Sequence, residues 1–224
     1  MGSYDENPSE TGFHSRFRNL LHSYTHQTGH REAYTFWTGC GAIYRNLFLQ
    51  YGGFDTTPGG IDDVELGRRL AVSGVRIELH PEIQVQHRKR WTFFSWVATD
   101  FRLRGIPWTL LIFRERSMPN VLNLDYRNRA SVALVWVALV GAAAAVFRSD
   151  LGFIPAVLVA ITLWLNRGCY SFLRKRGGFR FAIASAAAHL FHLLVCGASF
   201  LAGAVLFAFS PRRNESVLET FADR

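Results

Sequence analysis

The stretch Ile61-Asp62-Asp63-Val64-Glu65-Leu66-Gly67-Arg68-Arg69-Leu70 opens with carboxylates and continues with apolar side chains at helical spacing. This pattern predicts an amphipathic helix over residues 62–73 that ends at Gly74. Asp62 and Glu65 have the spacing of a capping box, with Asp62 as the N-cap. Asp63 then takes the first helical position, where the helix dipole keeps a carboxylate ionised. Beside the flexible glycine loop at 59–60, this carboxylate is suited to accept a proton from a hydroxyl. A solvated helix start is the simpler reading of Asp63 alone.

On both sides of this helix the sequence alternates between apolar and polar residues. The runs with β character are residues 33–37, 42–44, 75–79 and 83–87. Apolar side chains at helical spacing predict further helices at residues 13–27 and 46–51. This mixture of strands and helices predicts an α/β domain over residues 1–91.

Beyond residue 91 the sequence becomes apolar in long runs. Residues 92–130 combine Phe and Trp with flanking Arg, which is typical of helices in the lipid headgroup layer, although core helices of a soluble domain are the alternative. The runs without a charged side chain are residues 131–147, 151–166 and 181–210. Since a spanning helix needs about 20 apolar residues, we expect about three transmembrane helices over residues 131–210 and a polar tail at 211–224.

Charge and cysteine content limit the classes of partner. The chain of 224 residues has a formal net charge of +8. This charge suggests nucleic acid, anionic lipid or phosphorylated ligands as partners. Nucleic acid is the weakest of these and is not expected, because much of the excess Arg and Lys flanks apolar segments, a placement that suits anionic headgroups. The basic flanks of the first two apolar runs fall on one side, which the positive-inside rule makes cytoplasmic. The three cysteines have no metal-ligand spacing and are expected to be reduced and unpaired.

Several other residues are candidates for chemistry. The small residues Gly39 and Cys40 would let a substrate approach the backbone closely. His87 ends an alternating run and by default is an ordinary surface histidine, because a metal site needs further ligands. The basic run 88–90 could hold phosphate oxygens while Trp91 stacks on a sugar. In the last apolar run, His189 and His192 suggest haem or metal binding, although neutral hydrogen-bonded histidines explain them better.

Four stretches in this order resemble the later half of family 2 glycosyltransferases, most closely bacterial membrane-bound members. These stretches are residues 35–45, 52–55, 62–66 and 87–91. The resemblance implies the acceptor-side half of a GT-A (Rossmann-like) domain. It also implies that Asp63 is the catalytic base, with Asp62 in place of the usual Glu. It places Arg90, Trp91, Trp37, Gly39 and Cys40 at the donor diphosphate or acceptor, and His87 at a divalent Mg or Mn ion.

One departure from the family concerns the donor. The nucleotide-binding half that ends in an Asp-x-Asp metal motif has no counterpart here, and Asp-x-Asp occurs nowhere in the chain. The resemblance therefore implies a membrane-bound inverting glycosyltransferase of the bacterial inner membrane, with its catalytic part in the cytoplasm. It would transfer a sugar from a nucleotide-sugar to a lipid-linked or saccharide acceptor, and be inactive without an amino-terminal half. The alternative is a non-catalytic membrane scaffold or degenerate fragment that binds anionic lipid or a partner.

Overall fold

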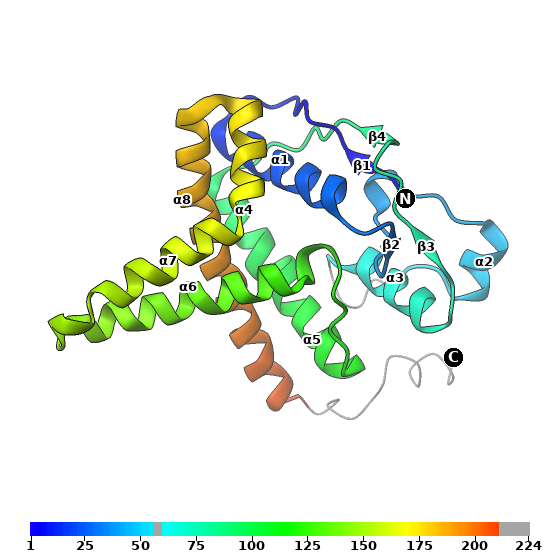
Figure 1. The fold of residues 1–224 in the computed structure, drawn as a ribbon. Coiled ribbons are helices and arrows are strands. Elements are labelled where there is room, and N and C mark those ends of the chain that lie inside the picture. The colour runs from blue at the N-terminus through cyan, green and yellow to red at the C-terminus, as the bar shows by residue number, and fades with distance from the viewer. Residues whose placement is uncertain (56–59, 211–224) are drawn as a thin grey trace. The chain divides into compact units, whose positions relative to one another are not determined.

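Helices dominate the computed structural model, which describes residues 1–55 and 60–210 (Figure 1). Helices account for 68% of the structure and strands for 4%. The prediction of an α/β fold, as half of a GT-A domain, is wrong: the described residues contain no Rossmann-like α/β domain. Gly59 and the tail predicted at 211–224 lie outside the described residues.

The chain divides into two compact units. Unit 1 comprises Met1–Leu122 together with Ser199–Arg224, and unit 2 comprises Asn123–Ala198. Of the region predicted at the membrane interface, residues 92–122 lie in unit 1 and residues 123–130 in unit 2. In unit 1 the helices are α1 (Phe13–Thr28), α2 (Arg45–Gln50), α3 (Asp62–Val72), α4 (Phe93–Ala98) and α5 (Ile106–Glu115). A π-helix, η2 (Thr99–Gly105), joins α4 to α5.

The predicted strands shrink to two-residue pairs. β1 (Ser3–Tyr4) pairs in parallel with β4 (Gln84–Val85), and β2 (Glu32–Ala33) pairs antiparallel with β3 (Ile77–Glu78). The alternation itself is confirmed around β3, because Ile77 and Leu79 are buried while Glu78 is exposed. Alternation shows which face of a run is buried, but it does not show how many partner strands exist. Here two pairs form instead of one sheet.

The α3 helix packs directly against the segment that precedes η1 (Thr38–Cys40). A Cβ atom at Gly67 would lie 2.1 Å from the backbone nitrogen of Phe36, so only glycine permits this approach. Phe36 donates its N–H to the carbonyl oxygen of Asp63 at 3.1 Å. The helix start and the segment before η1 are thereby held together.

The predicted capping box is absent. The N-cap of α3 is Ile61, with no side-chain cap bond, so Asp62 is the first helical residue and not the cap. Glu65 is instead buried in an ion pair with Arg69, at 2.6 Å. Arg69 also donates to the carbonyl oxygens of Tyr51 and Gly53 and so holds the glycine turn before α3. The Glu65 carboxylate therefore binds Arg69, four residues later in the same helix, instead of capping the start of α3.

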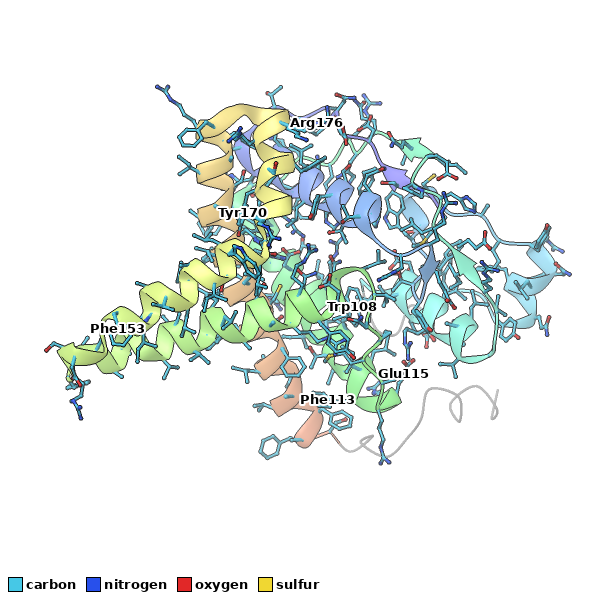
Figure 2. The ribbon with its side chains drawn as sticks, in the orientation of Figure 1. Trp108, Phe113, Glu115, Phe153, Tyr170 and Arg176 are labelled. Atoms are coloured by element: carbon cyan, nitrogen blue, oxygen red, sulfur yellow. The ribbon has the colours of Figure 1, made fainter. Side chains whose placement is uncertain are left out.

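Unit 2 begins with a helical hairpin. α6 (Tyr126–Ala145) and α7 (Phe153–Leu165) run side by side, joined through η4 (Ser149–Leu151), as the sequence predicts (Figure 1). Arg148 and Asp150 form an ion pair at 2.9 Å in the turn, and Phe153 lies close to it (Figure 2). At the other end, buried Asn166 donates to the Ser131 hydroxyl at 2.8 Å. Such interhelical polar bonds stabilise apolar helix pairs.

The helix α8 (Arg167–Ala208) reverses direction at Gly178, whose φ of 82° and ψ of 178° are not helical. The Tyr170 hydroxyl lies 2.9 Å from Nδ1 of His189, 19 residues later. A straight helix would separate these positions by about 28 Å, so the two arms fold back on each other (Figure 1). Beyond the second arm, residues 199–208 belong to unit 1, where Phe207 stacks on Phe113 of α5 at 5.3 Å.

The predicted spans differ in length. Within the described residues, α6 and α8 are long and apolar enough to cross a membrane, whereas α7 has 13 residues. At 1.5 Å per residue α7 measures about 20 Å, short of a bilayer core of about 30 Å. Three spans thus remain a prediction. Cys40, Cys169 and Cys196, all within the described residues, form no disulfide with one another, as expected.

Candidate functional site

Asp63 is held at the second position of α3 with its carboxylate partly buried. The Thr38 hydroxyl donates to Oδ2 at 3.4 Å, and the Val64 N–H donates to Oδ1 at 2.8 Å. Burial raises the pKa of Asp63, helped by the charge of Asp62, while the N–H groups of Val64 and Thr38 and the charge of Arg104 oppose the rise. A carboxylate with a raised pKa is a stronger base than an unperturbed one.

Tyr4 forms the centre of an aromatic cluster beside Asp63. Because Tyr4 pairs with Val85 across the β1–β4 ladder, its ring meets His87, two residues further on, at 4.1 Å. The Trp37 ring contacts Tyr4 edge to face at 4.3 Å, and His26 of α1 contacts Trp37 at 4.8 Å. Burial raises the pKa of Tyr4. The Arg104 charge and a side-chain hydrogen bond with Trp37 oppose the rise, and the Asp63 charge adds a smaller contribution to it. Thus the predicted residues Trp37, Asp63 and His87 gather around one tyrosine that the sequence did not single out.

His22 joins two guanidinium groups on the α1 side of the cluster. Its Nε2 lies 3.4 Å from Nη2 of Arg18 and 3.2 Å from Nη1 of Arg104. Since guanidinium groups only donate, this nitrogen must be an unprotonated acceptor. Arg18 also pairs with Asp100 of η2 at 2.7 Å, and the Trp96 indole donates to the same carboxylate at 2.6 Å. A buried ion pair thus fixes η2 against α1.

The histidines of the cluster are neutral at pH 7. Burial, followed by the charges of Arg18 and Arg104, holds the pKa of His22 well below its usual value. Burial lowers the pKa of His26 to about 4. For His87 burial and then Lys89, Arg104 and Arg18 lower the pKa to about 4 as well. The cluster therefore presents imidazole as an acceptor and leaves the positive charge on Arg and Lys.

Acidification is expected to unfold unit 1 progressively below pH 6.5. An unfolded histidine has a pKa near 6.5, whereas folded His26 has a pKa of about 4. The unfolded state therefore binds more protons between these values, so stability present above pH 6.5 is lost as the pH falls towards 4. Between these two pKa values, His26 alone should lower the free energy of unfolding by about 1.4 kcal/mol for each unit by which the pH falls. Denaturant titrations followed by tryptophan fluorescence from pH 7 to pH 5 measure this.

The matched control is His26→Gln, which removes one titration and leaves the carboxylates unchanged. Its unfolding free energy should fall less steeply with acid than that of the unmodified chain. Equal slopes for the two proteins would mean that His26 is not buried as a neutral group.

The basic run 88–90 and Trp91 do not meet the Asp63 cluster as the resemblance implies. Arg90 is exposed, while Trp91 is 4% exposed and donates its indole N–H to Asn19 at 3.2 Å. Lys89 lies over the outer face of the same ring, 4.0 Å from its centroid. Trp91 is thus unavailable for stacking on a sugar, and its burial fixes the segment between β4 and α4.

Gly39 and Cys40 serve the packing of Trp37. A Cβ at Gly39 would lie 2.3 Å from the Trp37 ring, so the glycine makes room for the indole and not for a substrate. The Cys40 carbonyl accepts the N–H of Gly2 at 2.7 Å, which ties η1 to the residues before β1.

His87 does not fit the expected metal site. Its Nδ1 is hydrogen-bonded to the Asn19 side-chain oxygen, and the nearest histidine ring, His22, is 6.4 Å away. Within residues 1–55 and 60–210, no group of three or more His, Cys, Asp or Glu side chains could hold a metal ion. The charges acting on His87 come from Lys89 and two arginines, which would repel a divalent cation. A divalent metal in the complete enzyme therefore stays a prediction, and the described residues supply no set of ligands for it.

Sequence reasoning missed Tyr4, His22 and Arg104. Tyr4 lies in a two-residue strand that carries no recognisable pattern. His22 and His26 are four residues apart on one helix face, and Asp100 and Arg104 have the same spacing, so both pairs were detectable signals. What the sequence lacked was any indication that these two faces meet.

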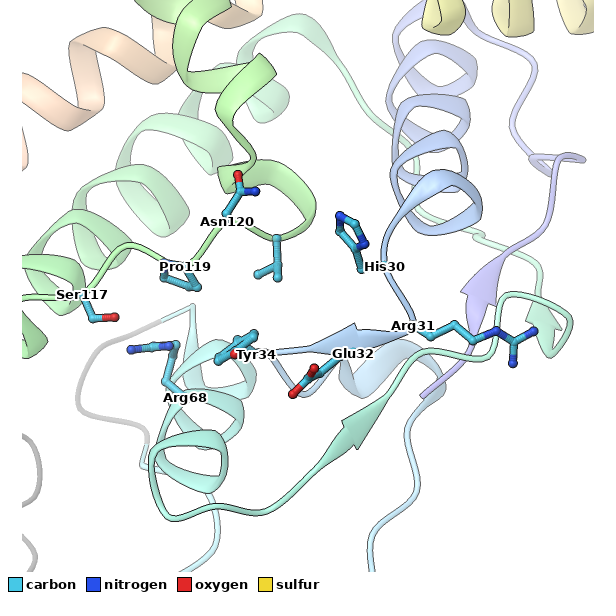
Figure 3. A pocket seen from close by; sticks show the side chains of 9 residues that line it. His30, Arg31, Glu32, Tyr34, Arg68, Ser117, Pro119 and Asn120 are labelled. Atoms are coloured by element: carbon cyan, nitrogen blue, oxygen red, sulfur yellow. The ribbon is translucent and has the colours of Figure 1, made fainter.

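A separate cavity of about 520 Å³ opens on another side of α3 (Figure 3). Tyr34 and Arg68 line it from below the segment that contains Ser117 and Pro119. Arg68 is five residues from Asp63, which turns it about 140° around the helix. Its guanidinium pairs with Glu115 at 2.6 Å. The cavity is therefore distinct from the Asp63 cluster, and its buried charge is already balanced.

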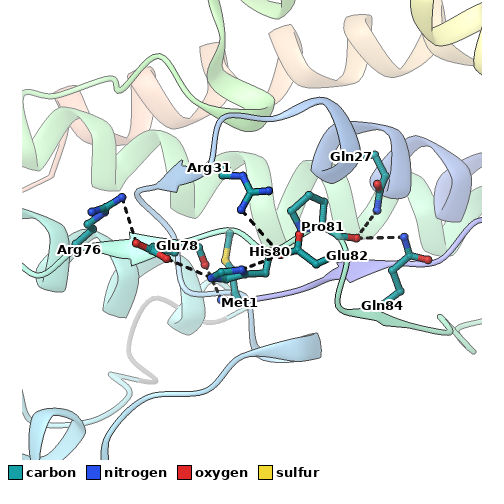
Figure 4. A network of polar contacts seen from close by, with 9 residues as sticks. All are labelled: Met1, Gln27, Arg31, Arg76, Glu78, His80, Pro81, Glu82 and Gln84. Atoms are coloured by element: carbon teal, nitrogen blue, oxygen red, sulfur yellow. Dashed lines mark hydrogen bonds and ion pairs between the residues drawn. The ribbon is translucent and has the colours of Figure 1, made fainter.

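A network of exposed polar contacts braces the segment between β3 and β4 (Figure 4). His80 lies between Glu78 and Glu82, at 3.2 and 3.0 Å. Gln27 of α1 donates to the Pro81 carbonyl at 2.8 Å. Exposed ion pairs contribute little individually, so the network sets the path of the chain towards His87 more than it stabilises the unit.

No protein-family model, curated protein or solved structure matches this chain.

Proposed function

We propose that the chain supplies the acceptor-activating part of a membrane-bound inverting glycosyltransferase. The observation that carries the proposal is the Asp63 carboxylate, partly buried, with a raised pKa and held by Thr38 beside Tyr4 and Trp37. The order of the motifs at residues 35–45, 52–55, 62–66 and 87–91 supports it. Binding of the nucleoside part of the donor is assigned to residues beyond the Asp63 cluster or to a separate polypeptide.

In the proposed reaction Asp63 takes the proton from an acceptor hydroxyl. The acceptor oxygen forms a bond to the anomeric carbon while the bond from that carbon to the donor phosphate breaks. The electron pair leaves with the nucleoside diphosphate, and the configuration at the anomeric carbon inverts. Trp37, edge to face with Tyr4, gives the acceptor an apolar wall. Aromatic walls of this kind bind the apolar faces of sugar rings.

We further propose that unit 2 anchors the protein in the bacterial cytoplasmic membrane, with unit 1 in the cytoplasm. Only 17% of the most apolar window of α6 and 28% of that of α8 is buried, which supports a membrane location over the core of a soluble unit. Phe147 and Phe153 are 87% and 65% exposed at the hairpin turn. Lipid is the solvent that such surfaces require.

The test is sugar transfer in membranes. Membranes carrying the chain, with and without the polypeptide encoded upstream, are incubated with a panel of radiolabelled nucleotide-sugars and lipid extract. We expect label to enter lipid or polysaccharide when both polypeptides are present, and Asp63→Asn to abolish it. Absence of transfer from every donor, with the protein folded, would favour the alternative of a non-catalytic scaffold.

A further inference from the structure

Arg104 differs from the buried arginines of unit 1 in its partner. The buried guanidiniums each have a carboxylate: Arg18 pairs with Asp100, Arg68 with Glu115 and Arg69 with Glu65, all within 2.7 Å. Arg104 is partly buried, yet among the described residues its side chain has one hydrogen-bond contact, to neutral His22, and no ion pair. A cation removed from water without a counter-charge is costly, so such a site favours an anion.

The position of Arg104 is fixed from two directions. It projects from η2, and π-helical turns are frequently found at functional sites. Gly60, just before α3, packs against η2, since a Cβ there would lie 2.6 Å from the Leu103 carbonyl oxygen. The start of α3, with Asp63, and the η2 turn are therefore neighbours.

Positive charge exceeds negative charge around Arg104. Its guanidinium acts electrostatically on Tyr4, Asp63 and Lys89. The nearby Asp100 carboxylate is already paired with Arg18. The Asp63 carboxylate feels the charge of Arg104 but forms no ion pair with it within 4 Å. The remaining N–H groups of the guanidinium can take a planar oxyanion in a bidentate manner.

We propose that Arg104, held by His22 on the η2 turn that packs against Gly60 just before α3, is the cationic centre of a binding site for a phosphate-type oxyanion. The inference deepens the proposed function, and rests on it for the role of the anion in transfer. Arg104 of η2 thereby takes the phosphate-binding role that the resemblance gives to Arg90, which is exposed. Lys89, on which the Arg104 charge also acts, adds a second positive charge to the site. Its ammonium group is a point charge and cannot bind an oxyanion in the bidentate manner of a guanidinium.

The experiment measures binding of sodium pyrophosphate to the full chain in detergent micelles by isothermal titration calorimetry at fixed ionic strength. Arg104→Gln is expected to weaken binding by about 10- to 100-fold, the range for a charge-assisted hydrogen bond. Arg104→Lys keeps the charge and should lose less. The matched control is Arg102→Gln, an exposed arginine of the same π-helix, which should bind like the unmodified chain.

Competition then distinguishes the sources of the oxyanion. A nucleoside diphosphate and farnesyl phosphate, a soluble lipid phosphate, are each tested for displacement of pyrophosphate. Displacement by the nucleoside diphosphate points to the sugar donor as the source of the oxyanion. Displacement by farnesyl phosphate points to a lipid-linked acceptor. Equal losses for Arg102→Gln and Arg104→Gln, or no saturable binding by folded unmodified chain, would overturn the proposal. Arg104-dependent binding without transfer would overturn the proposed function alone, whereas Asp63-dependent transfer without that binding would overturn this inference alone.

Discussion

Replacing Asp63 with asparagine is expected to reduce sugar transfer by about 10²- to 10⁴-fold, the usual contribution of a general base. The amide retains the shape of the side chain. Its oxygen can accept from the Val64 N–H, and its NH2 group can donate to the Thr38 hydroxyl, which donates to the other carboxylate oxygen in the unmodified protein. The amide cannot take a proton from a hydroxyl. The loss should therefore appear in the rate of transfer at saturating acceptor, measured in membranes that contain both polypeptides.

Asp62→Asn is the matched comparison, because the two carboxylates are adjacent on α3. Asp62 carries no cap bond and acts on Asp63 only by raising its pKa, so its removal should cause a far smaller loss. Both variants should unfold at the same denaturant concentration as the unmodified chain. Transfer that survives Asp63→Asn undiminished would remove Asp63 from the catalytic role.

Replacing Arg69 with methionine is expected to lower the unfolding free energy by about 3–5 kcal/mol, the range for breaking a buried ion pair. The exposed fractions of the Arg69 and Glu65 side chains are 3% and 2%. The variant leaves the Glu65 carboxylate buried and the carbonyls of Tyr51 and Gly53 without their donor. Since domains are stable by only about 5–15 kcal/mol, chemical denaturation should show a large loss, and the glycine turn before α3 should become sensitive to protease.

Arg76→Met makes the same chemical change in an exposed pair, where the side-chain exposures of Arg76 and Glu78 are 74% and 45%. We expect it to cost less than about 1 kcal/mol. A double variant, Glu65→Met with Arg69→Met, should recover part of the loss because no charge remains buried. Similar losses for Arg69→Met and Arg76→Met would contradict the buried pair.

The helices of unit 1 were predictable because their apolar spacing is local. The start of α3, its end at Gly74 and the helix over residues 13–27 all follow from patterns within one element. The fold class was not predictable in the same way. The alternating run around β3 buries Ile77 and Leu79, whereas Ile83 in the run around β4 is exposed. Among the described residues each run pairs with one short strand, and neither pair extends into a larger sheet.

The candidate site was predictable only in part, for the same reason. Trp37 and His87 both contact Tyr4, and Asp63 is bonded to Thr38, the residue after Trp37. The missing residues depend on tertiary contacts between distant segments, as when η2 meets α1 at His22. Trp91 shows the converse: an aromatic next to basic residues looks like a binding residue, yet its hydrogen bond to Asn19 makes it part of the core.

The reversal of α8 at Gly178 restricts how the length of this segment can change. The pairing of Tyr170 with His189 depends on the number of residues between each side chain and the turn. One residue inserted between Gly178 and His189 would rotate the second arm by about 100° relative to the first. About seven inserted residues, close to two helical turns, would return His189 to the same face. We therefore expect insertions and deletions in this hairpin to occur in whole turns or to be matched in both arms.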